Sequence, residues 1–328
     1  MKIGVLGAGH LGKIHIKCIK LAPEKLELVG FYDIDSKMAA KVAEELDVKA
    51  YQELEDLLDA VDIVDIVTPT PTHHYLAKIA INKGKHIFIE KPLTQTVEEA
   101  EELIKLSKEK RVKVQVGHVE RFNPALLALD ENTLNPKFIE AHRLAIFNPR
   151  GTDVSVVLDL MIHDIDIILS MIDSEVTNIS ANGVAVVSPT PDIANARIEF
   201  ANGAVANITT SRISMKQMRK VRLFQKDAYI SLDFLDKQAQ VIRMFDKDAK
   251  EVGQLDNLME LHTGADTKYI HIDMPPIEPI NAIKMELETF ADSIKNNSRP
   301  RVNIEDGYKA LKVAHDIIKS IDEKASAL

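Results

Sequence analysis

Two short segments of the chain carry residue types that support acid–base chemistry. The first is Glu90-Lys91-Pro92, which directly follows an apolar run from His86 to Ile89. A lysine at the end of a buried parallel strand lies at the edge of the sheet where ligands bind. Its ammonium group can stabilise negative charge that develops on a substrate oxygen. The alternative is an ordinary solvent-exposed lysine, which composition alone favours.

The second segment lies in an apolar stretch with helical periodicity. Asp159, His163 and Asp166 are spaced i, i+4 and i+7, so a helix presents them on one face. Charges on the buried side of a helix are costly unless they are paired or functional. A carboxylate one turn from an imidazole orients the ring and favours its protonated form, as a general acid/base requires. A core histidine with satisfied hydrogen bonds is the alternative, and the pairing favours catalysis.

A glycine-rich segment predicts a dinucleotide site. Residues 7–12 read GAGHLG, directly after the apolar run that ends at Leu6 and before a helical pattern. In this context Gly7 allows a tight turn, Gly9 lets the backbone approach a pyrophosphate at the helix N-terminus, and Gly12 permits close helix packing. The alternative is a glycine turn that binds nothing. The residues predicted to contact the cofactor here are Gly7, Gly9, His10, Leu11 and Gly12.

The end of the next predicted strand favours NAD over NADP. Asp33 lies about 20 residues after the glycine segment, where a carboxylate accepts hydrogen bonds from the adenosine ribose. A 2′-phosphate would meet a like charge there, and no arginine follows. The next strand is followed by a proline-rich segment at the same sheet edge, which either contacts the cofactor or simply ends the strand. Its predicted contacts are Thr68, Pro69 and His73.

Composition excludes several classes of protein. The 328 residues are 45% hydrophobic and 28% charged, and 41 Lys and Arg against 50 Asp and Glu give a net charge of −9. That sign disfavours a general nucleic-acid or anionic-membrane binder. The single cysteine, Cys18, suits a reducing compartment. We find no signal-peptide pattern and no apolar run long enough to span a bilayer, so we expect a cytoplasmic protein.

The first third of the chain alternates between apolar runs and helical patterns, which predicts a doubly wound parallel sheet. Ser36 and Thr96 are predicted N-caps, and Glu99 completes a capping box with Thr96. The predicted strands are 3–6, 26–32, 63–67, 86–89 and 113–116, and the predicted helices are 10–20, 36–46, 74–83 and 96–109.

The rest of the chain has a different rhythm. Consecutive strand-like runs without intervening helices predict a mostly antiparallel sheet. Residues 246–279 are poorly periodic and are predicted to be irregular. The predicted strands are 138–147, 176–187, 194–200, 204–211, 221–225, 228–232 and 238–245, and the predicted helices are 155–172, 279–296 and 304–324.

The order of these segments resembles the Gfo/Idh/MocA (glucose–fructose oxidoreductase/inositol dehydrogenase) family over nearly the whole chain. The resemblance implies an N-terminal Rossmann domain, residues 1–120, and a C-terminal α+β domain, residues 121–328, with a large, mostly antiparallel open sheet. C-terminal helices packing back on the first domain and homodimers or homotetramers are also expected. The matching elements are GAGHLG, Thr68-Pro69 with His73, Gly84-Lys85-His86, Glu90-Lys91-Pro92-Leu93, Arg121 with Pro124, Asp159 to Asp166, and Glu286 with Phe290.

The resemblance also implies roles for individual residues. Lys91 is expected to contact the nicotinamide and the reacting hydroxyl, beside the cofactor contact Glu90. His163 is expected to be the general acid/base, assisted by Asp159, and both groups must meet Lys91 on one substrate carbon. The implied step is hydride transfer between NAD and a secondary hydroxyl of a sugar. Many members have glycine where this chain has Met161, which puts the transfer of their substrates in doubt.

The segments around Arg121 and His163 are most similar to the sugar-nucleotide branch, which includes UDP-N-acetylglucosamine 3-dehydrogenases. A diphosphate substrate needs cations, and Arg121 and Arg212 are the predicted contacts, together with Lys91, Asp159 and His163. Arg219, Lys220 and Arg222 are further candidates, although a solvated strand edge explains them as well. The alternatives are a free sugar or polyol dehydrogenase and a non-catalytic NAD-binding regulator. No metal ligand is predicted.

Overall fold

The computed structural model describes residues 1–148, 154–262, 264 and 266–326. These residues form two compact units. The first contains residues 1–122 and 280–313, and the second contains residues 123–279 and 314 onward. The division places the first boundary two residues after the expected one and assigns a late segment of the chain to the first unit.

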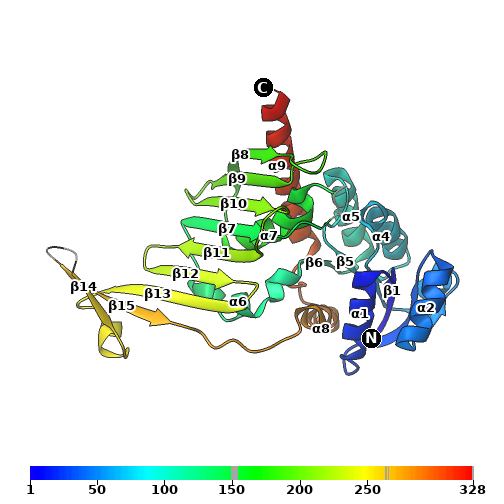
Figure 1. Ribbon diagram of the computed structural model, residues 1–328. Helices are drawn as coiled ribbons and strands as arrows, with labels where there is room; N and C mark the ends of the chain where they lie inside the picture. The colour runs from blue at the N-terminus through cyan, green and yellow to red at the C-terminus, as the bar shows by residue number, and fades with distance from the viewer. Residues whose placement is uncertain (149–153, 263, 265, 327–328) are drawn as a thin grey trace. The chain divides into compact units, whose positions relative to one another are not determined.

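The first unit contains a parallel sheet of six strands in the order β3-β2-β1-β4-β5-β6 (Figure 1). This is the strand order of dinucleotide-binding folds. The order in which strands are added to the sheet reverses between β1 and β4. Strand interiors are apolar because helices cover both faces of a parallel sheet. The strands are β1 (Lys2–Leu6), β2 (Glu27–Tyr32), β3 (Ala50–Tyr51), β4 (Ile63–Ile66), β5 (His86–Glu90) and β6 (Val114–Gly117).

Helices from both ends of the chain build the core of this unit. Ile16 and Ile19 of α1 and Leu287 and Phe290 of α8 belong to one buried cluster with residues of β1 and β5, among them Phe88. On another side of the sheet α4 packs on α5. The helices are α1 (His10–Lys20), α2 (Ser36–Leu46), α3 (Leu54–Ala60), α4 (His73–Asn82), α5 (Val97–Lys110) and α8 (Ala282–Lys295).

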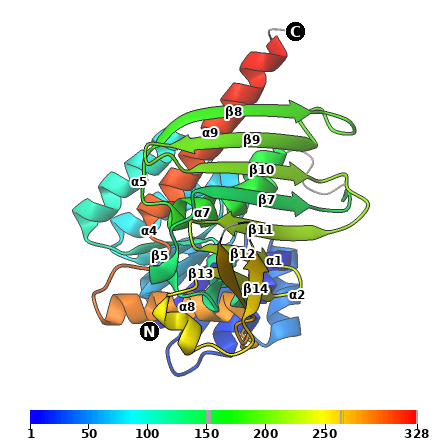
Figure 2. The same ribbon diagram turned by 90° about the vertical axis from the view of Figure 1, so that its left-hand side faces the viewer.

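The second unit is built on a nine-stranded sheet in the order β14-β15-β13-β12-β11-β7-β10-β9-β8. The pairs are antiparallel, as predicted, except that β10 runs parallel to β7. Figure 2 shows one broad face of this sheet. The strands are β7 (Phe138–Leu144), β8 (Val176–Val184), β9 (Ile193–Phe200), β10 (Val205–Ser211), β11 (Met218–Phe224), β12 (Ala228–Asp233), β13 (Gln238–Asp246), β14 (Met259–His262) and β15 (Thr267–Asp273).

Two helical segments lie on the other face of this sheet. A π-helical turn (Val157–Met161) runs directly into α7 (Ile162–Met171), and the C-terminal part of α9 (Ile304–Ser326) lies against β8. Ser320 Oγ accepts a hydrogen bond from the Ala181 amide. The short helix α6 (Pro124–Leu127) contacts β12 and β13. None of the described helices combines the length and the apolar character that a bilayer crossing requires.

The segment 246–279, predicted to be irregular, contains a hairpin. Strand β14 pairs with β15, and β15 pairs with β13. The four residues of β14 alternate between apolar and polar types, but all four are exposed, so the strand buries neither face. Its pairing with β15, and the pairing of β15 with the more distant β13, form this element. The hairpin projects from the edge of the sheet in Figure 1.

The predicted capping box at Thr96 is confirmed, whereas the predicted cap at Ser36 is wrong. Thr96 Oγ accepts from the Glu99 amide, and the Glu99 carboxylate accepts from the Thr96 amide. Helix α2 starts one residue after Asp35, whose carboxylate accepts from the amides of residues 37 and 38. Asp is as good an N-cap as Ser, and here it precedes the first helical residue.

These caps predict a difference between two neighbouring substitutions. Asp35→Ala removes an acceptor from two first-turn amides and should lower the free energy of unfolding by about 1 kcal/mol. Ser36→Ala removes no cap and should change it by less than about 0.5 kcal/mol. Urea unfolding of both variants without cofactor measures the difference. Equal losses in the two variants would contradict the assignment.

Candidate active site

The glycine segment forms a tight turn against the end of β4. Gly7 has a φ of +95°, and a Cβ atom there would lie 2.8 Å from the carbonyl oxygen of Val67. A Cβ atom on Gly12 would lie 2.0 Å from the Gly7 carbonyl oxygen, which no side chain permits. Gly9 is different, because no atom lies within 4 Å of the position of its Cβ. The turn therefore leaves open space at Gly9 alone.

The start of α1 has the properties of an anion site that fits a dinucleotide. Gly9 is its N-cap and has no side chain to occupy the first-turn amides, and the first turn contains no acidic residue. The positive end of the helix dipole is thus directed to the open space. Asp33 Oδ2 accepts from the Ala8 amide at 2.7 Å, and its Oδ1 accepts from the Asp35 amide at 2.9 Å. The Asp33 carboxylate is therefore held beside the start of α1 by two backbone amides.

His73 links the two loops that follow β4 and β5. Its Nε2 lies 2.8 Å from the Thr68 carbonyl oxygen, and its Nδ1 lies 2.9 Å from the Pro92 carbonyl oxygen. The ring is 1% exposed. Burial lowers the pKa of His73, and the two carbonyl groups oppose this. The side chain therefore fixes the spacing of the loops that carry Thr68-Pro69 and Lys91.

Glu90 is the last residue of β5 and is buried beside Lys91, which is half-buried. Its Oε2 accepts from the Lys91 amide at 3.2 Å, and its Oε1 lies 3.2 Å from His15 Nε2. Gly117 of the neighbouring strand makes room for it, since a Cβ there would lie 2.6 Å from Oε1. The Lys91-Pro92 peptide bond is cis. The backbone of Lys91 is thus anchored to a buried carboxylate.

Sequence analysis gave no role to three buried ionisable residues below this carboxylate. His15, Asp65 and Glu286 are all 0% exposed. His15, Glu90 and Glu286 also form a set that offers metal-ligand atoms within 4.8 Å of one another, although no metal ligand was predicted. Asp65 gives a usable sequence signal, because a charge in the middle of the buried strand IVDI needs a partner.

His118 and Arg121 follow β6 in the first unit. The short helix that carries Arg121 spans Val119–Phe122, and the Arg121 guanidinium lies 3.5 Å from the carbonyl oxygen of Arg301. Burial, with the positive charges of Arg121 and Lys91, lowers the pKa of His118 to about 3. His118 is therefore neutral near pH 7, and the cations lie at the same sheet edge as the glycine turn.

In the second unit, Asp159 belongs to the π-helical turn that precedes the α-helix carrying His163. A π turn contains one more residue than a turn of α-helix. A pattern with 3.6 residues per turn therefore does not predict it. Such turns occur frequently at functional sites. His163 and Asp159 are both half-buried, whereas Asp166 is buried. Met161 is 0% exposed and ends the π turn.

The helix that carries His163 is fixed by a buried ion pair that the sequence did not reveal. Arg143 of β7 contacts Asp164 through two hydrogen bonds of 2.9 Å, one from Nε and one from an NH2 group. This bidentate geometry gives both strength and direction. Because Asp164 is the residue after His163, the pair fixes the rotation of the helix and thus the position of the imidazole.

The predicted cation Arg212 is buried at the end of β10. Its guanidinium donates to the Val154 carbonyl oxygen at 2.6 Å, just before the π turn. Its amide donates to the carbonyl oxygen of Asp192. Burial opposes ionisation of Asp192, yet three amides, those of residues 186–188, hold the pKa of its carboxyl below the ordinary value. Arg212 thus lies in a structured corner next to the His163 segment.

Two of the other candidate cations lie in cross-strand pairs. Lys220 contacts Asp233 at 3.1 Å, and Arg222 contacts Glu140 at 3.5 Å, both on neighbouring strands. These contacts favour the interpretation of Lys220 and Arg222 as parts of the sheet surface.

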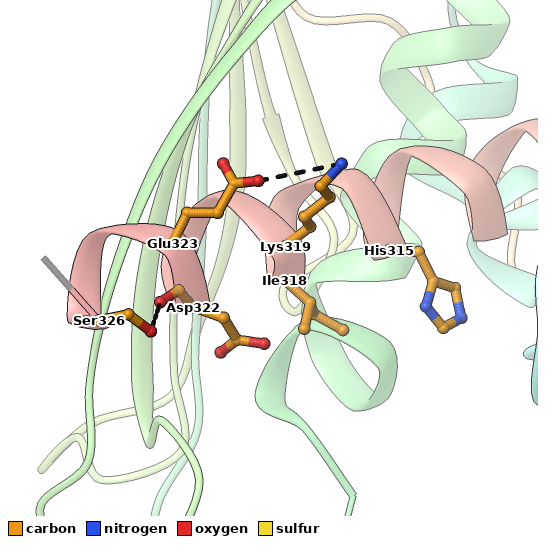
Figure 3. Close-up of a pocket in the computed structure, with 6 residues that line it drawn as sticks. All are labelled: His315, Ile318, Lys319, Asp322, Glu323 and Ser326. Carbon is orange, nitrogen blue, oxygen red and sulfur yellow. Dashed lines mark hydrogen bonds and ion pairs between the residues drawn. The ribbon is translucent and has the colours of Figure 1, made fainter.

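A shallow pocket on α9 is unrelated to the predicted site residues. Figure 3 shows its six lining residues along one side of a single helix, with an ion pair of 3.9 Å between Lys319 and Glu323. No predicted site residue lines it. The candidate residues of the first unit lie at the edge of its sheet, and those of the second unit lie on and next to the helix that carries His163.

Comparison with protein families identifies both parts of the chain. Residues 1–118 match the model of an oxidoreductase family with an NAD-binding Rossmann fold, and residues 138–230 match the model of the GFO/IDH/MocA C-terminal domain. Together the matches cover more than half of the chain.

Individual relatives include several sugar and polyol dehydrogenases. The UDP-N-acetylglucosamine 3-dehydrogenase of Acidithiobacillus ferrooxidans is 40% identical over 72% of this chain and 75% of its own length. Its crystal structure matches 98% of both chains with a TM-score of 0.87. The myo-inositol 2-dehydrogenase of Thermotoga maritima is 26% identical over 99% of this chain and 98% of its own length.

The space that Gly117 leaves for Glu90 predicts the effect of one methyl group. Gly117→Ala should displace the Glu90 carboxylate and lower the free energy of unfolding by about 1–3 kcal/mol, as overpacked interiors do. Gly253→Ala is the matched control, because no atom lies within 4 Å of its Cβ position. Chemical unfolding of both variants tests this. An unchanged free energy of unfolding for Gly117→Ala would contradict the geometry.

Proposed function

The chain belongs to the GFO/IDH/MocA oxidoreductase family, and on this premise we propose that it oxidises the 3-hydroxyl of a UDP-N-acetylhexosamine, with NAD as the oxidant. The observation that carries the proposal is similarity along the full chain. The UDP-N-acetylglucosamine 3-dehydrogenase matches 98% of this chain at a TM-score of 0.87 and 32% identity.

Contacts at the glycine turn support NAD as the cofactor. Bound nicotinamide supplies a two-electron acceptor for hydride. We propose that the amides at the start of α1 hold the diphosphate beside Gly9 and that Asp33 accepts hydrogen bonds from the adenosine ribose. The residue after Asp33 is the exposed Ile34, so a 2′-phosphate would face a carboxylate and no neighbouring guanidinium. This favours NAD over NADP.

Three side chains supply the proposed acid–base chemistry. The C–H bond of the secondary alcohol breaks and its electron pair leaves as hydride, while the O–H proton passes to the imidazole of His163. The Lys91 ammonium stabilises the alkoxide character that develops on the oxygen. Asp159 orients the imidazole and stabilises it when it carries the proton. The alcohol thus becomes a ketone, with the hydride transferred to NAD⁺ and the proton held on His163.

Two arginines are proposed to recognise the diphosphate of the substrate. Arg121 lies on the short helix after β6, and the Arg212 guanidinium donates to the Val154 carbonyl oxygen, just before the segment that carries Met161 and His163. Guanidinium groups suit phosphate oxygens because they donate in a planar fork. Buried Met161, two residues before His163, stands where many family members have glycine, and we propose that its bulk helps to select among sugars by shape.

The open space at Gly9 predicts a variant that folds but does not bind cofactor. Gly9→Ala meets no protein atom and has an ordinary φ of −64°, so its thermal midpoint should match that of the parent. The methyl group lies where the diphosphate must approach, and the dissociation constant for NADH should rise at least about tenfold, or about 1.4 kcal/mol. Fluorescence titration measures this. Unchanged affinity would contradict the placement of the diphosphate.

Substrate and mechanism are tested together by product analysis. The chain is incubated with NAD⁺ and UDP-N-acetylglucosamine, with hydroxylamine to trap the ketone, and the products are analysed by mass spectrometry. We expect NADH and an oxime of the 3-keto sugar. Lys91→Ala and His163→Gln should each lower turnover on the order of 100-fold while the dissociation constant for NADH changes little.

A parallel reaction with myo-inositol tests the second candidate function. The full-length match to a myo-inositol 2-dehydrogenase is the observation that favours it. Faster turnover of inositol than of the nucleotide sugar would assign the chain to polyol oxidation. NADH binding without turnover of any sugar would identify a regulator.

A further inference from the structure

Four ionisable side chains from four elements meet in the interior of the first unit. His15 comes from α1, Asp65 from β4, Glu90 from β5 and Glu286 from α8. Three of them are 0% exposed and Glu90 is 8% exposed. Isolated buried charges are very costly, so these groups must compensate one another.

The imidazole of His15 lies between two carboxylates. Its Nδ1 is 2.9 Å from Asp65 Oδ2, and its Nε2 is 3.2 Å from Glu90 Oε1. Only an imidazolium has a proton on both nitrogens, so this arrangement suits the charged ring. The edge of the ring also packs against Phe88, with 5.7 Å between the ring centroids.

Glu286 is the fourth member, and neither of its carboxylate oxygens has a hydrogen-bond partner among the described residues. One of its oxygens lies within 4.8 Å of atoms of both His15 and Glu90. A charged Glu286 would be repelled by Glu90, whereas a neutral one carries a hydroxyl that can donate toward it.

The pKa directions agree with this geometry. Burial opposes the charged form of His15, yet Asp65 and Glu90 raise its pKa well above the ordinary value. Burial, reinforced by the charge of Glu90, raises the pKa of Glu286 well above the ordinary value. Burial also raises the pKa of Asp65, and His15 opposes this. Cys18 also faces the cluster, and burial raises the pKa of its thiol. The imidazoles of His73 and His118 also interact with the charge of Glu90, and burial lowers the pKa of both.

We propose that His15, Asp65 and Glu286 are positioning residues that fix the junction between Glu90 and Lys91, and that the cluster holds shared protons on His15 and Glu286. The proposal rests on the proposed role of Lys91 as a catalytic residue. Under this proposal, α8 helps to position Lys91, although α8 lies late in the chain and Lys91 lies within the first 120 residues.

The path from the cluster to Lys91 is short. Glu90 Oε1 faces His15, and its Oε2 accepts from the Lys91 amide. A shift of the Glu90 carboxylate therefore moves the backbone that carries the ammonium. Misplacement of a catalytic group by about 1 Å can cost on the order of 100-fold in rate.

A divalent metal is the competing occupant, because His15, Glu90 and Glu286 are plausible ligands and Asp65 could orient the ring. Two observations favour protons. Both nitrogens of His15 already face carboxylates, and the side chains are at most one-tenth exposed, so an ion has to cross the packed interior. Metal content is accordingly an outcome of the test.

The raised pKa values fix the sign of the pH dependence. The folded chain keeps protons on this cluster that the unfolded chain releases at lower pH. The contribution of the cluster to stability is therefore largest at acidic pH and is lost as pH rises. Glu286→Gln imitates the protonated carboxyl and removes its titration.

The experiment compares the thermal midpoints of the parent, Glu286→Gln and Glu288→Gln between pH 6 and pH 9, without cofactor. Glu288 lies on the same helix and pairs with Lys284 at 3.6 Å, so it is a matched control. We expect the midpoint of Glu286→Gln to rise relative to the parent as pH increases, with the control parallel to the parent. If the thermal midpoint of Glu286→Gln changed with pH in parallel with that of the parent, the proposal would be overturned.

Two further readouts test the positioning role and the metal. His15→Gln should speed hydrogen exchange of the Lys91 amide and lower kcat by at least about tenfold, with the NADH dissociation constant changed less than about threefold. Unchanged exchange and kcat, or one equivalent of divalent metal in the parent that is lost in Glu286→Gln, would overturn it. Stability and exchange need no substrate, so they remain decisive if the proposed substrate is wrong.

Discussion

The first unit depends on one electrostatic constraint: charges buried under the carboxyl edge of its sheet must neutralise one another. His15 contacts Asp65 and Glu90, and Glu90 in turn holds the Lys91 amide. Burial gives these contacts a strength that exposed pairs lack, because little water screens them. The same constraint explains the glycine at position 117, since only a residue without a side chain leaves space for the Glu90 carboxylate.

The second unit also contains a buried ion pair, formed by different residues. Arg143 and Asp164 are buried together and hold the helix that carries His163 against the sheet. In both units, a buried ionic contact lies one residue from a proposed catalytic group, Glu90 before Lys91 and Asp164 after His163. The proposed catalytic side chains can then be partly exposed while their backbones are fixed by the interior.

Periodicity and turn motifs were sufficient to predict most of the fold. The glycine turn, the parallel sheet and the capping box at Thr96 all depend on neighbours in sequence, so local patterns reveal them. The pairing of β15 with β13, the π turn at Asp159 and the contact of Glu286 with the cluster around His15 depend on residues far apart in sequence or on a non-standard repeat. The N-cap of α2 is Asp35 and not Ser36. Both are good capping residues, and only the backbone conformation determines which of the two precedes the first helical residue.

We propose that hydride leaves carbon 3 of a nucleotide sugar. UDP-N-acetylglucosamine carrying deuterium at carbon 3, incubated with NAD⁺ and the chain, tests it most directly by NMR of the reduced cofactor. The account predicts one deuterium at C4 of the nicotinamide ring. NADH without deuterium, or no NADH from this sugar while inositol is oxidised, would contradict it.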